Sequence, residues 1–328
     1  MIRRGAALLV AAGTALGACA PAPVAIGPAP HVPATARSVR LDVQTAQVNG
    51  RRVAWAELGT GTPLVLLNGT GSPMAEWDPL LLAELATHRR VIVYDYPGLG
   101  GSQRLAGRLT FDRLAQSLDG LLEQLGLRQV DVLGWSMGTF VAQRLAVRHP
   151  AVLRRLILVG GNPGGSRTVL GPRWVQRADS DPDAGTKTYL KTNFPRTGCA
   201  QAAGRRFLNR QALAVESGRY PPDRVPPRTY DAMVAAEDPW LRSNRNSREI
   251  KGITAPTLIM VGSKDVITPP SNSTALRRLI PGAVLRVLGD SGHSALFQDP
   301  AVGARVVDQF LTDRLTSATR QTVATSCS

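Results

Sequence analysis

The sequence predicts an α/β fold with a doubly wound, mostly parallel sheet of eight strands and a helical segment inserted after the sixth strand. Three observations lead to this prediction. Short apolar runs alternate with stretches of helical period over most of the 328 residues. The runs are almost continuously apolar, which is typical of parallel strands covered on both faces. The alternation stops between residues 162 and 252, where proline, glycine and arginine are frequent.

The predicted elements follow in a regular order. The first two strands, 41–48 and 52–58, alternate polar and apolar residues, and Asn49-Gly50 between them is a strong hairpin signal. The later strands are expected at 64–67, 91–94, 130–133, 156–159, 257–261 and 284–288. The helices between and after them are expected at 79–87, 110–125, 137–148, 271–279 and 301–315.

These boundaries divide the chain into parts with different roles. The insert contains helix-compatible pieces near 186–190, 201–215 and 228–236, so we expect it to form a helical cap. The expected parts are a signal peptide with a lipobox at 1–19, a Pro/Ala-rich linker at 20–38, a core at 39–161 and 253–315, the cap at 162–252 and a tail at 316–328.

The most specific local pattern is Gly134-Trp135-Ser136-Met137-Gly138, a G-x-S-x-G sequence. It follows the apolar run 130–133 and precedes the helix expected at 137–148. A strand, a sharp turn and a helix in this order are the context in which G-x-S-x-G presents a nucleophile. Glycines on either side allow a strained turn without a Cβ clash, so the serine hydroxyl projects from the sheet edge. Ser136 is therefore the candidate nucleophile, and Gly134, Trp135 and Gly138 form its turn.

A serine hydroxyl needs an adjacent base, which is usually a histidine held by a carboxylate. The chain has four histidines. His31 lies in a Pro/Ala-rich stretch, His88 lies where a helix leads into a strand, and His149 ends the Ser136 helix. At 1.5 Å per residue, that helix places His149 roughly 20 Å from Ser136. His293 remains, in a loop after the strand 284–288, and although a lone loop histidine is usually a surface residue, the elimination favours a catalytic base.

Asp265 is the candidate for the orienting acid. It follows the buried strand 257–261 at the carboxyl edge, where ligands gather in open α/β sheets. The alternative is a turn aspartate paired with Lys264. Asp290 is the second candidate, but three residues before His293 it is better placed to shape the loop, and Asp95 is expected to be structural.

Two backbone N–H groups are expected to stabilise the oxyanion that forms during acyl transfer. One is the N–H of Met137, which follows the nucleophile at a helix N-terminus. The second is expected from the loop after the strand 64–67, Asn68-Gly69-Thr70-Gly71, with Thr70 N–H as the candidate.

With Ser136, Asp265 and His293 in this chain order, residues 41–315 resemble the α/β-hydrolase fold superfamily, in the branch with a cap domain. The segment 94–102 is similar to the turn after the fourth strand of that family. Members usually carry His-Gly in the first oxyanion loop, where this chain has Asn68-Gly69. The resemblance implies the α/β-hydrolase fold, a Ser-His-Asp triad and no cofactor.

The cap contains aromatic residues that we expect to form mostly its own small core, with one or two at an apolar substrate pocket. These are Trp174, Tyr189, Phe194, Phe207, Tyr220, Tyr230 and Trp240.

The first nineteen residues indicate export. Arg3-Arg4 and the apolar stretch 6–16 have the form of a signal peptide, and the stretch is too short for a transmembrane helix. Leu16-Gly17-Ala18-Cys19 resembles a bacterial lipobox, whose cysteine would be lipidated. We therefore expect an exported bacterial lipoprotein held at a membrane surface by Cys19, with ordinary secretion and a cytoplasmic start as alternatives.

The net charge of +15 comes from scattered arginines without a recognised nucleic-acid module, so we expect no nucleic-acid partner. Beyond Cys19, Cys199 and Cys327 remain, and an oxidising compartment would permit a disulfide between them. The sequence does not show whether their Cα atoms approach each other, so the pairing stays open. We expect no metal site, because no Cys/His spacing matches a ligand set.

The sequence thus predicts a serine hydrolase that cleaves a small apolar carboxylic ester through an acyl-enzyme. Cofactor-free haloperoxidases are similar around Gly-Trp-Ser-Met-Gly, so perhydrolysis by the same triad is one alternative. The other is a non-catalytic binding protein on a hydrolase scaffold, against which the complete triad argues. Haloalkane dehalogenases are disfavoured because they need an aspartate in place of Ser136. No feature of the sequence indicates the oligomeric state.

Overall fold

The structure is a computed structural model that describes residues 38–179, 185–315 and 320–328. The predicted signal peptide, the lipobox with Cys19 and almost all of the linker lie outside these residues. In the part of the chain that is described, no helix combines the length and the apolar character needed to cross a membrane.

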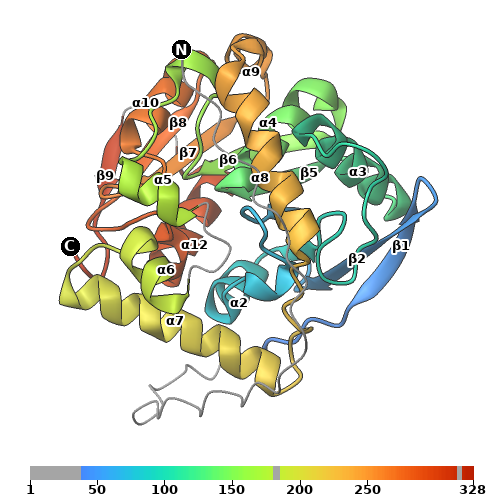
Figure 1. The fold of residues 1–328 in the computed structure, drawn as a ribbon, viewed down its shortest axis with the longest axis horizontal. Helices are drawn as coiled ribbons and strands as arrows, with labels where there is room; N and C mark the ends of the chain where they lie inside the picture. Colours follow the sequence, from blue (N-terminus) through green and yellow to red (C-terminus); the bar gives the residue numbers. More distant parts are fainter. Residues whose placement is uncertain (1–37, 180–184, 316–319) are drawn as a thin grey trace, which may run out of the picture. The chain divides into compact units, whose positions relative to one another are not determined.

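The described residues contain a nine-stranded sheet in the order β1-β2-β4-β3-β5-β6-β7-β8-β9 (Figure 1). β1 pairs with β2 and β2 with β4 in antiparallel fashion, and all later neighbours are parallel. The strands are β1 (Gln44–Val48), β2 (Arg51–Leu58), β3 (Pro63–Leu67), β4 (Arg90–Tyr94), β5 (Val130–Trp135), β6 (Leu153–Val159), β7 (Thr257–Gly262), β8 (Val284–Leu288) and β9 (Gln321–Val323).

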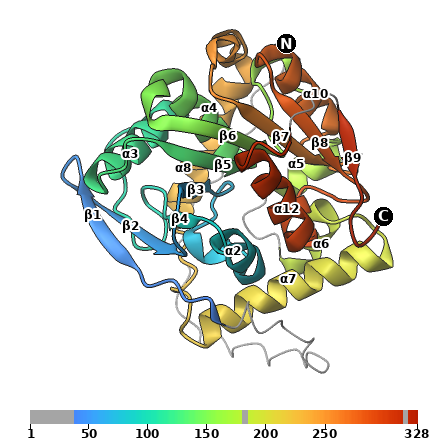
Figure 2. The same ribbon diagram turned by 180° about the vertical axis from the view of Figure 1, so that it is seen from behind.

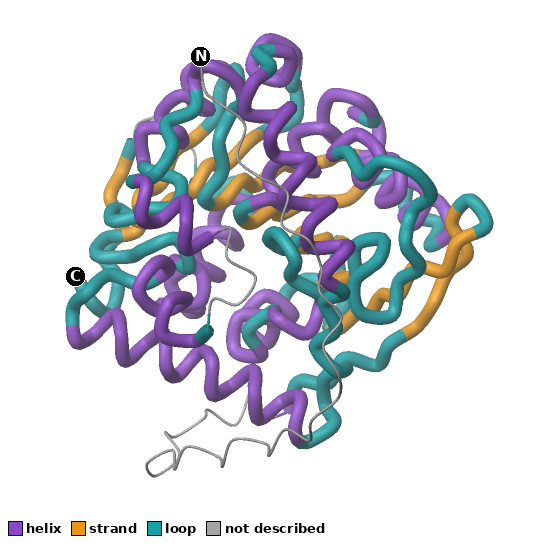
Figure 3. The backbone as a smooth tube through the Cα atoms, viewed as in Figure 1, coloured by secondary structure: helices purple, strands orange, loops and turns teal. Residues whose placement is uncertain are grey.

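Helices cover both faces of the sheet, as Figures 2 and 3 show. Side chains of β3 alternate between the two faces: Val65 and Leu67 join the apolar cluster of α3, α4 and α10, whereas Leu64 and Leu66 join that of α2, α11 and α12. The predicted doubly wound, mostly parallel fold is therefore confirmed. These helices are α2 (Pro79–Ala86), α3 (Phe111–Gln124), α4 (Met137–Arg148), α10 (Pro270–Leu279), α11 (Ala295–Gln298) and α12 (Pro300–Leu311).

The insert between β6 and β7 is helical, as predicted, and α7 and α8 are its long yellow and orange helices in Figure 1. Thr197 begins α7 by accepting a hydrogen bond from Ala200 N–H at 3.3 Å. The helices of the insert are α5 (Arg173–Asp179), α6 (Thr186–Asn193), α7 (Gly198–Glu216), α8 (Pro227–Arg242) and α9 (Arg245–Glu249). Short 3₁₀ turns in the chain are η1 (Met74–Glu76), η2 (Pro150–Val152), η3 (Gly165–Arg167) and η4 (Ile250–Gly252).

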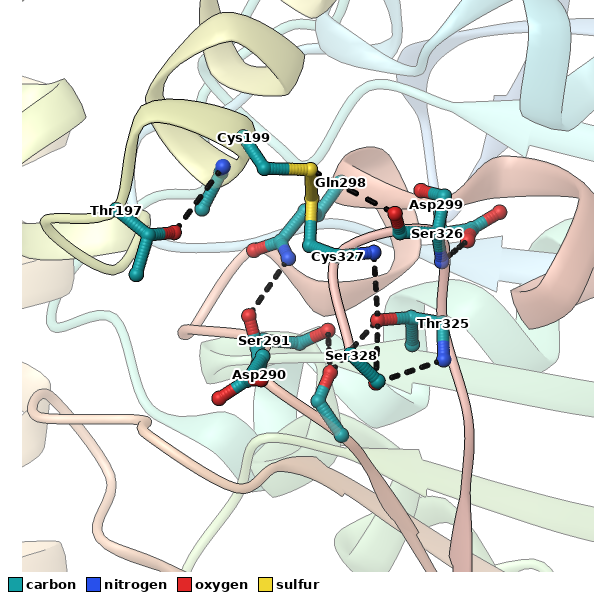
Figure 4. Close-up of a disulfide and its surroundings, with 12 residues drawn as sticks. Thr197, Cys199, Asp290, Ser291, Gln298, Asp299, Thr325, Ser326, Cys327 and Ser328 are labelled. Carbon is teal, nitrogen blue, oxygen red and sulfur yellow. Dashed lines mark hydrogen bonds between the residues drawn. A yellow bond between two sulfur atoms is a disulfide. The ribbon is translucent and has the colours of Figure 1, made fainter.

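The expected number of eight strands is wrong, because the C-terminal tail adds β9 parallel to β8. Residues 321–323 are mostly exposed and carry no apolar pattern, so pairing with β8 rather than burial makes them a strand. The tail is also held by a disulfide between Cys327 and Cys199 at the start of α7, with Cα atoms 5.6 Å apart (Figure 4). Gly289 N–H donates to Val323 O, and Thr325 Oγ1 donates to Gly289 O, each at 2.8 Å.

Candidate active site

Ser136 lies at the turn between β5 and α4, so the strand, turn and helix predicted around it are present. Its φ of 54° is in the left-handed region, which non-glycine residues rarely adopt. Both neighbouring glycines are required by close backbone contacts. A Cβ on Gly134 would lie 2.4 Å from Gly138 O, and a Cβ on Gly138 would lie 2.1 Å from Leu67 O. The turn therefore holds Ser136 at the carboxyl edge of the sheet.

His293 and Asp265 are brought together at the same edge, in the loops after β8 and β7. Asp265 Oδ2 lies 2.9 Å from His293 Nδ1, and both side chains are buried, with 0% and 3% of their surface exposed. Lys264, the alternative partner of Asp265, instead pairs with Asp290 at 2.5 Å. Asp290 has a φ of 41° and its carbonyl accepts a hydrogen bond from Gln298, so it shapes the loop as expected.

The buried pair lies beside the residues that flank Ser136. Trp135 Nε1 donates to His293 O at 3.1 Å, and the two rings lie 5.5 Å apart. Ser136 N–H also donates to Val159 O at the end of β6. Gly160 follows Val159, and a Cβ on Gly160 would lie 3.2 Å from His293 Cε1, so the end of β6 lies against the imidazole. Because Nδ1 is bonded to Asp265, Nε2 is the ring nitrogen left to accept a proton from a hydroxyl.

The loop after β3 passes over the serine. A Cβ on Gly69 would lie 3.5 Å from Ser136 Cβ. Asn68 fixes the start of this loop through its side chain, which donates to Pro73 O at 2.9 Å and accepts from Gly69 N–H at 3.0 Å. Gly71 N–H contacts Met233 Sδ at 3.4 Å, and Ser72 N–H donates to Gly69 O at 3.3 Å.

The N–H groups of this loop therefore differ in their availability. Those of Gly69, Gly71 and Ser72 are engaged, whereas Thr70 N–H has no acceptor among the residues that the structure describes. Met137 is the first residue of α4, so its N–H has no partner within the helix. Thr70 and Met137 thus each have an N–H group outside these hydrogen bonds, and their role as oxyanion donors stays a prediction.

Helix α8 of the cap contacts the same loop. Thr70 Oγ1 donates to Glu237 Oε1 at 2.7 Å, and the ring of Tyr230 packs against Gly71, where a Cβ would lie 2.5 Å from its Cδ2. Tyr230 is thus one cap aromatic at the site. A second is Tyr189 of α6, whose hydroxyl lies 3.0 Å from the hydroxyl of Ser294, next to His293.

The expectation that most cap aromatics form the cap's own small core holds in part. Tyr189, Phe194 and Phe207 pack against one another with ring centroids 6.1 to 6.4 Å apart, but two of the cap aromatics also stack on the α/β core. Phe207 stacks on Phe297 of α11 with ring centroids 4.6 Å apart. Trp240 stacks on Phe140 of α4 at 4.8 Å. The sequence did not show which core residues these cap helices would contact. Each of the two apolar clusters in the structure contains residues of both the cap and the core.

Two residues at the site escaped sequence reasoning. Glu237 is 167 residues from Thr70 in the chain, and no local pattern links the two. Thr268 donates its hydroxyl to Asp265 Oδ2 at 2.8 Å, and its N–H donates to Asp265 Oδ1 at 2.8 Å. The second contact has a local signal, because an aspartate often accepts from the N–H three residues later at a helix or turn start.

Carboxyl groups near the oxyanion loop are unusually buried. Burial, followed by the nearby charge of Asp223, raises the pKa of Glu76 to about 8, against the opposing hydrogen bond from Ser72. Asp95 accepts from Met74 N–H and Gly101 N–H at 2.8 Å each, which agrees with its expected structural role.

Within the described ranges, no group of three or more His, Cys, Asp and Glu side chains could hold a metal ion.

Comparison with known proteins places the chain in a family. Residues 62–300 match the α/β hydrolase fold family. The 2-hydroxymuconate semialdehyde hydrolase of Pseudomonas putida is 30% identical over 273 residues, which are 80% of this chain and 92% of that protein. The pimeloyl-[acyl-carrier protein] methyl ester esterase of Aeromonas hydrophila is 28% identical over 269 residues, 79% of this chain and 99% of that protein.

A solved structure agrees with this placement. An α/β hydrolase fold protein from Chitinophaga pinensis superposes with a TM-score of 0.73 at 25% identity and covers 84% of this chain and 98% of its own. The chain belongs to the α/β-hydrolase fold family and is a hydrolase.

Proposed function

We propose that this hydrolase cleaves a carboxylic ester through an acyl-enzyme formed on Ser136. The observation that carries the proposal is the buried hydrogen bond between His293 Nδ1 and Asp265 Oδ2 beside the strained turn of Ser136. A histidine held in this way has a defined tautomer, and its Nε2 can act as a general base.

In the proposed mechanism, His293 Nε2 takes the proton from Ser136 Oγ as the oxygen attacks the acyl carbon. The oxyanion accepts hydrogen bonds from the N–H groups of Met137 and Thr70. The imidazolium then gives its proton to the leaving alcohol, and Asp265 stays ionised and stabilises the positive ring. Water repeats the sequence on the acyl-enzyme and releases the acid.

The polar groups around the oxyanion loop support a substrate without a carboxylate near its acyl carbon. Thr70 donates to the Glu237 carboxyl group at 2.7 Å. A substrate carboxylate at this position would lie close to that carboxyl group, which is unfavourable when water is excluded. An apolar ester avoids this cost, whereas a muconate-type acid would incur it.

A fluorophosphonate probe tests the nucleophile, because it reacts with an activated serine and stays bound. We expect labelling of the wild-type protein and none in Ser136→Ala. Turnover of a p-nitrophenyl ester should fall by roughly 10⁴-fold or more in Ser136→Ala and in His293→Ala. Ser217→Ala, which changes an exposed serine at the end of α7, is the matched control and should keep both signals. Full labelling or turnover in Ser136→Ala would refute the proposal.

Two further measurements separate this function from its alternatives. A burst of p-nitrophenol equal to the enzyme concentration reports an acyl-enzyme and excludes a non-catalytic binding protein. Peracid formation when peroxide replaces water on the acyl-enzyme would identify a perhydrolase. Esters of graded acyl length, assayed in parallel, would define the length of chain that the cap accepts.

We further propose that the protein is exported and anchored to a membrane surface through Cys19. The support is the sequence Leu16-Gly17-Ala18-Cys19 after an apolar stretch, together with the Cys199–Cys327 disulfide, which is typical of oxidising compartments. The anchor would place an enzyme for apolar esters close to lipid.

A further inference from the structure

The hydroxyl of Thr268 contacts the hydrogen bond between the two charged members of the candidate triad. Its Oγ1 lies 2.8 Å from Asp265 Oδ2 and 3.2 Å from His293 Nδ1. Asp265 Oδ2 is also the oxygen that bonds His293 Nδ1 at 2.9 Å. Thr268 is buried, with 8% of its surface exposed, so water does not compete freely for this oxygen.

The direction of these bonds follows from the chemistry of the groups. A carboxylate only accepts, and a histidine that is oriented by a carboxylate donates its Nδ1–H to it. Two donors cannot bond each other, so the hydroxyl hydrogen of Thr268 is directed to Asp265 Oδ2. The short distance from Oγ1 to Nδ1 then results from their shared acceptor.

The other carboxylate oxygen is occupied as well. Asp265 Oδ1 accepts the backbone N–H groups of Ile267 at 2.9 Å and Thr268 at 2.8 Å. The carboxylate thus has four donors, of which only His293 and the Thr268 hydroxyl are side-chain groups. Removing the hydroxyl leaves the donors of Oδ1 unchanged and leaves the imidazole as the donor to Oδ2 among the described residues.

We propose that Thr268 is a positioning residue that sets the pH range in which His293 works as a base, by sharing the charge of Asp265. This rests on the proposed function of the triad. The hydroxyl disperses negative charge on Oδ2, so its loss leaves more charge facing the imidazole. The protonated imidazole is then stabilised, and the acid limb of the activity profile moves to higher pH. The carboxylate also loses one of its fixed contacts, which lowers kcat.

Other titratable groups face this pair and must stay unchanged in the test. Lys264 and Asp290 pair with each other at 2.5 Å beside the triad loops. Tyr189 faces His293's neighbour Ser294 from α6, and burial raises the pKa of its hydroxyl, so the phenol stays protonated. Glu237 of α8 bonds Thr70 across the site. None of these three contacts involves Thr268.

The experiment compares Thr268→Val, which has the same shape without the hydroxyl, with Thr268→Ser, which keeps the hydroxyl. For both variants and the wild type, kcat/KM for p-nitrophenyl acetate is measured as a function of pH. We expect Thr268→Val to lose about 10-fold in kcat with little change in KM, and its acid limb to move up by roughly 0.5 to 1 pH unit. Thr268→Ser should restore both values.

The outcomes separate this inference from the proposed function. If Ser136→Ala is inactive while Thr268→Val has a wild-type pH profile, Thr268 has no such role although the triad stands. If Ser136→Ala is as active as the wild type, the proposed function itself fails. Far-UV circular dichroism and urea unfolding check that each variant folds. Should Thr268→Val not fold, Thr268→Ala makes the same comparison, and the same shift in its acid limb is required.

Discussion

The buried ion pair between the cap and the core allows a quantitative test of how the cap is held. Arg210 of α7 binds Asp78 in a two-pronged geometry, with Nε to Oδ1 at 2.8 Å and Nη2 to Oδ2 at 2.5 Å. The Asp78 side chain is 0% exposed and that of Arg210 is 7% exposed. Asp78 Oδ1 also accepts Leu80 N–H at the start of α2. A buried ion pair therefore links α7 to the N-terminus of α2.

Asp78→Asn removes the charge but keeps the size of the side chain and an oxygen for Leu80 N–H. The guanidinium of Arg210 then stays buried without a counter-charge, which costs about 3 to 5 kcal/mol. That is a large part of a typical folding free energy of about 5 to 15 kcal/mol. In the double variant Asp78→Asn, Arg210→Met, no uncompensated charge is left, so the loss should fall to about 1 kcal/mol.

Urea unfolding followed by far-UV circular dichroism measures these differences for the two single variants and the double variant. Limited proteolysis within 185–252 reports whether the cap detaches before the core unfolds. Each single variant leaves one buried charge unpaired at about 3 to 5 kcal/mol and the double variant loses about 1 kcal/mol, so we expect a coupling free energy of about 5 kcal/mol or more between the two positions. If Asp78→Asn costs less than about 1 kcal/mol, or if the two single effects simply add, the pair does not hold the cap and the reasoning is wrong.

Three further predictions concern stability and location. Cys199 and Cys327 are 128 residues apart, so their reduction should lower the unfolding free energy by about 2 to 5 kcal/mol, and reductant should not affect the stability of Cys327→Ser. The pKa of Glu76 is about 8 in the folded protein and its ordinary value is 4.5, so the folded state holds an extra proton between these pH values and stability falls as pH rises through them. Because Glu76 as a whole residue keeps part of its surface in water, Glu76→Gln should remove only roughly 1 to 3 kcal/mol of this decline between pH 5 and 8.5. Unfolding curves that fall equally in both proteins would contradict the assignment. Finally, Cys19→Ser should move the protein from the membrane fraction to the soluble exported fraction, and an unchanged distribution would argue against lipidation.

The sequence predicted those parts of the fold that are determined by residues close to one another in the sequence. The strand before Ser136 is a buried apolar run, and its glycines make a turn that few other residues allow. The positions of Asp265 and His293 followed from strands that end at one edge of the sheet, so long-range proximity could be inferred from local patterns.

The remaining features depend on contacts between distant residues that have no local pattern. β9 consists of two exposed polar residues and the partly buried Val323, and pairing with β8 next to the disulfide makes it part of the sheet. Glu237 reaches Thr70 because α8 crosses the oxyanion loop, and nothing in the sequence of α8 fixes that crossing. Arg210 and Asp78 likewise read as ordinary surface charges until α7 is placed on α2.

The sulfur link at Cys327 also determines what a protease could do to this molecule. The polypeptide from Cys199 to Cys327 forms a closed covalent ring that includes α8, β7 and His293. A single cut within that ring would yield no free fragment, because both new ends would still belong to one molecule. On a denaturing gel, one band without reductant and two bands with it would reveal such a nicked but covalently intact molecule.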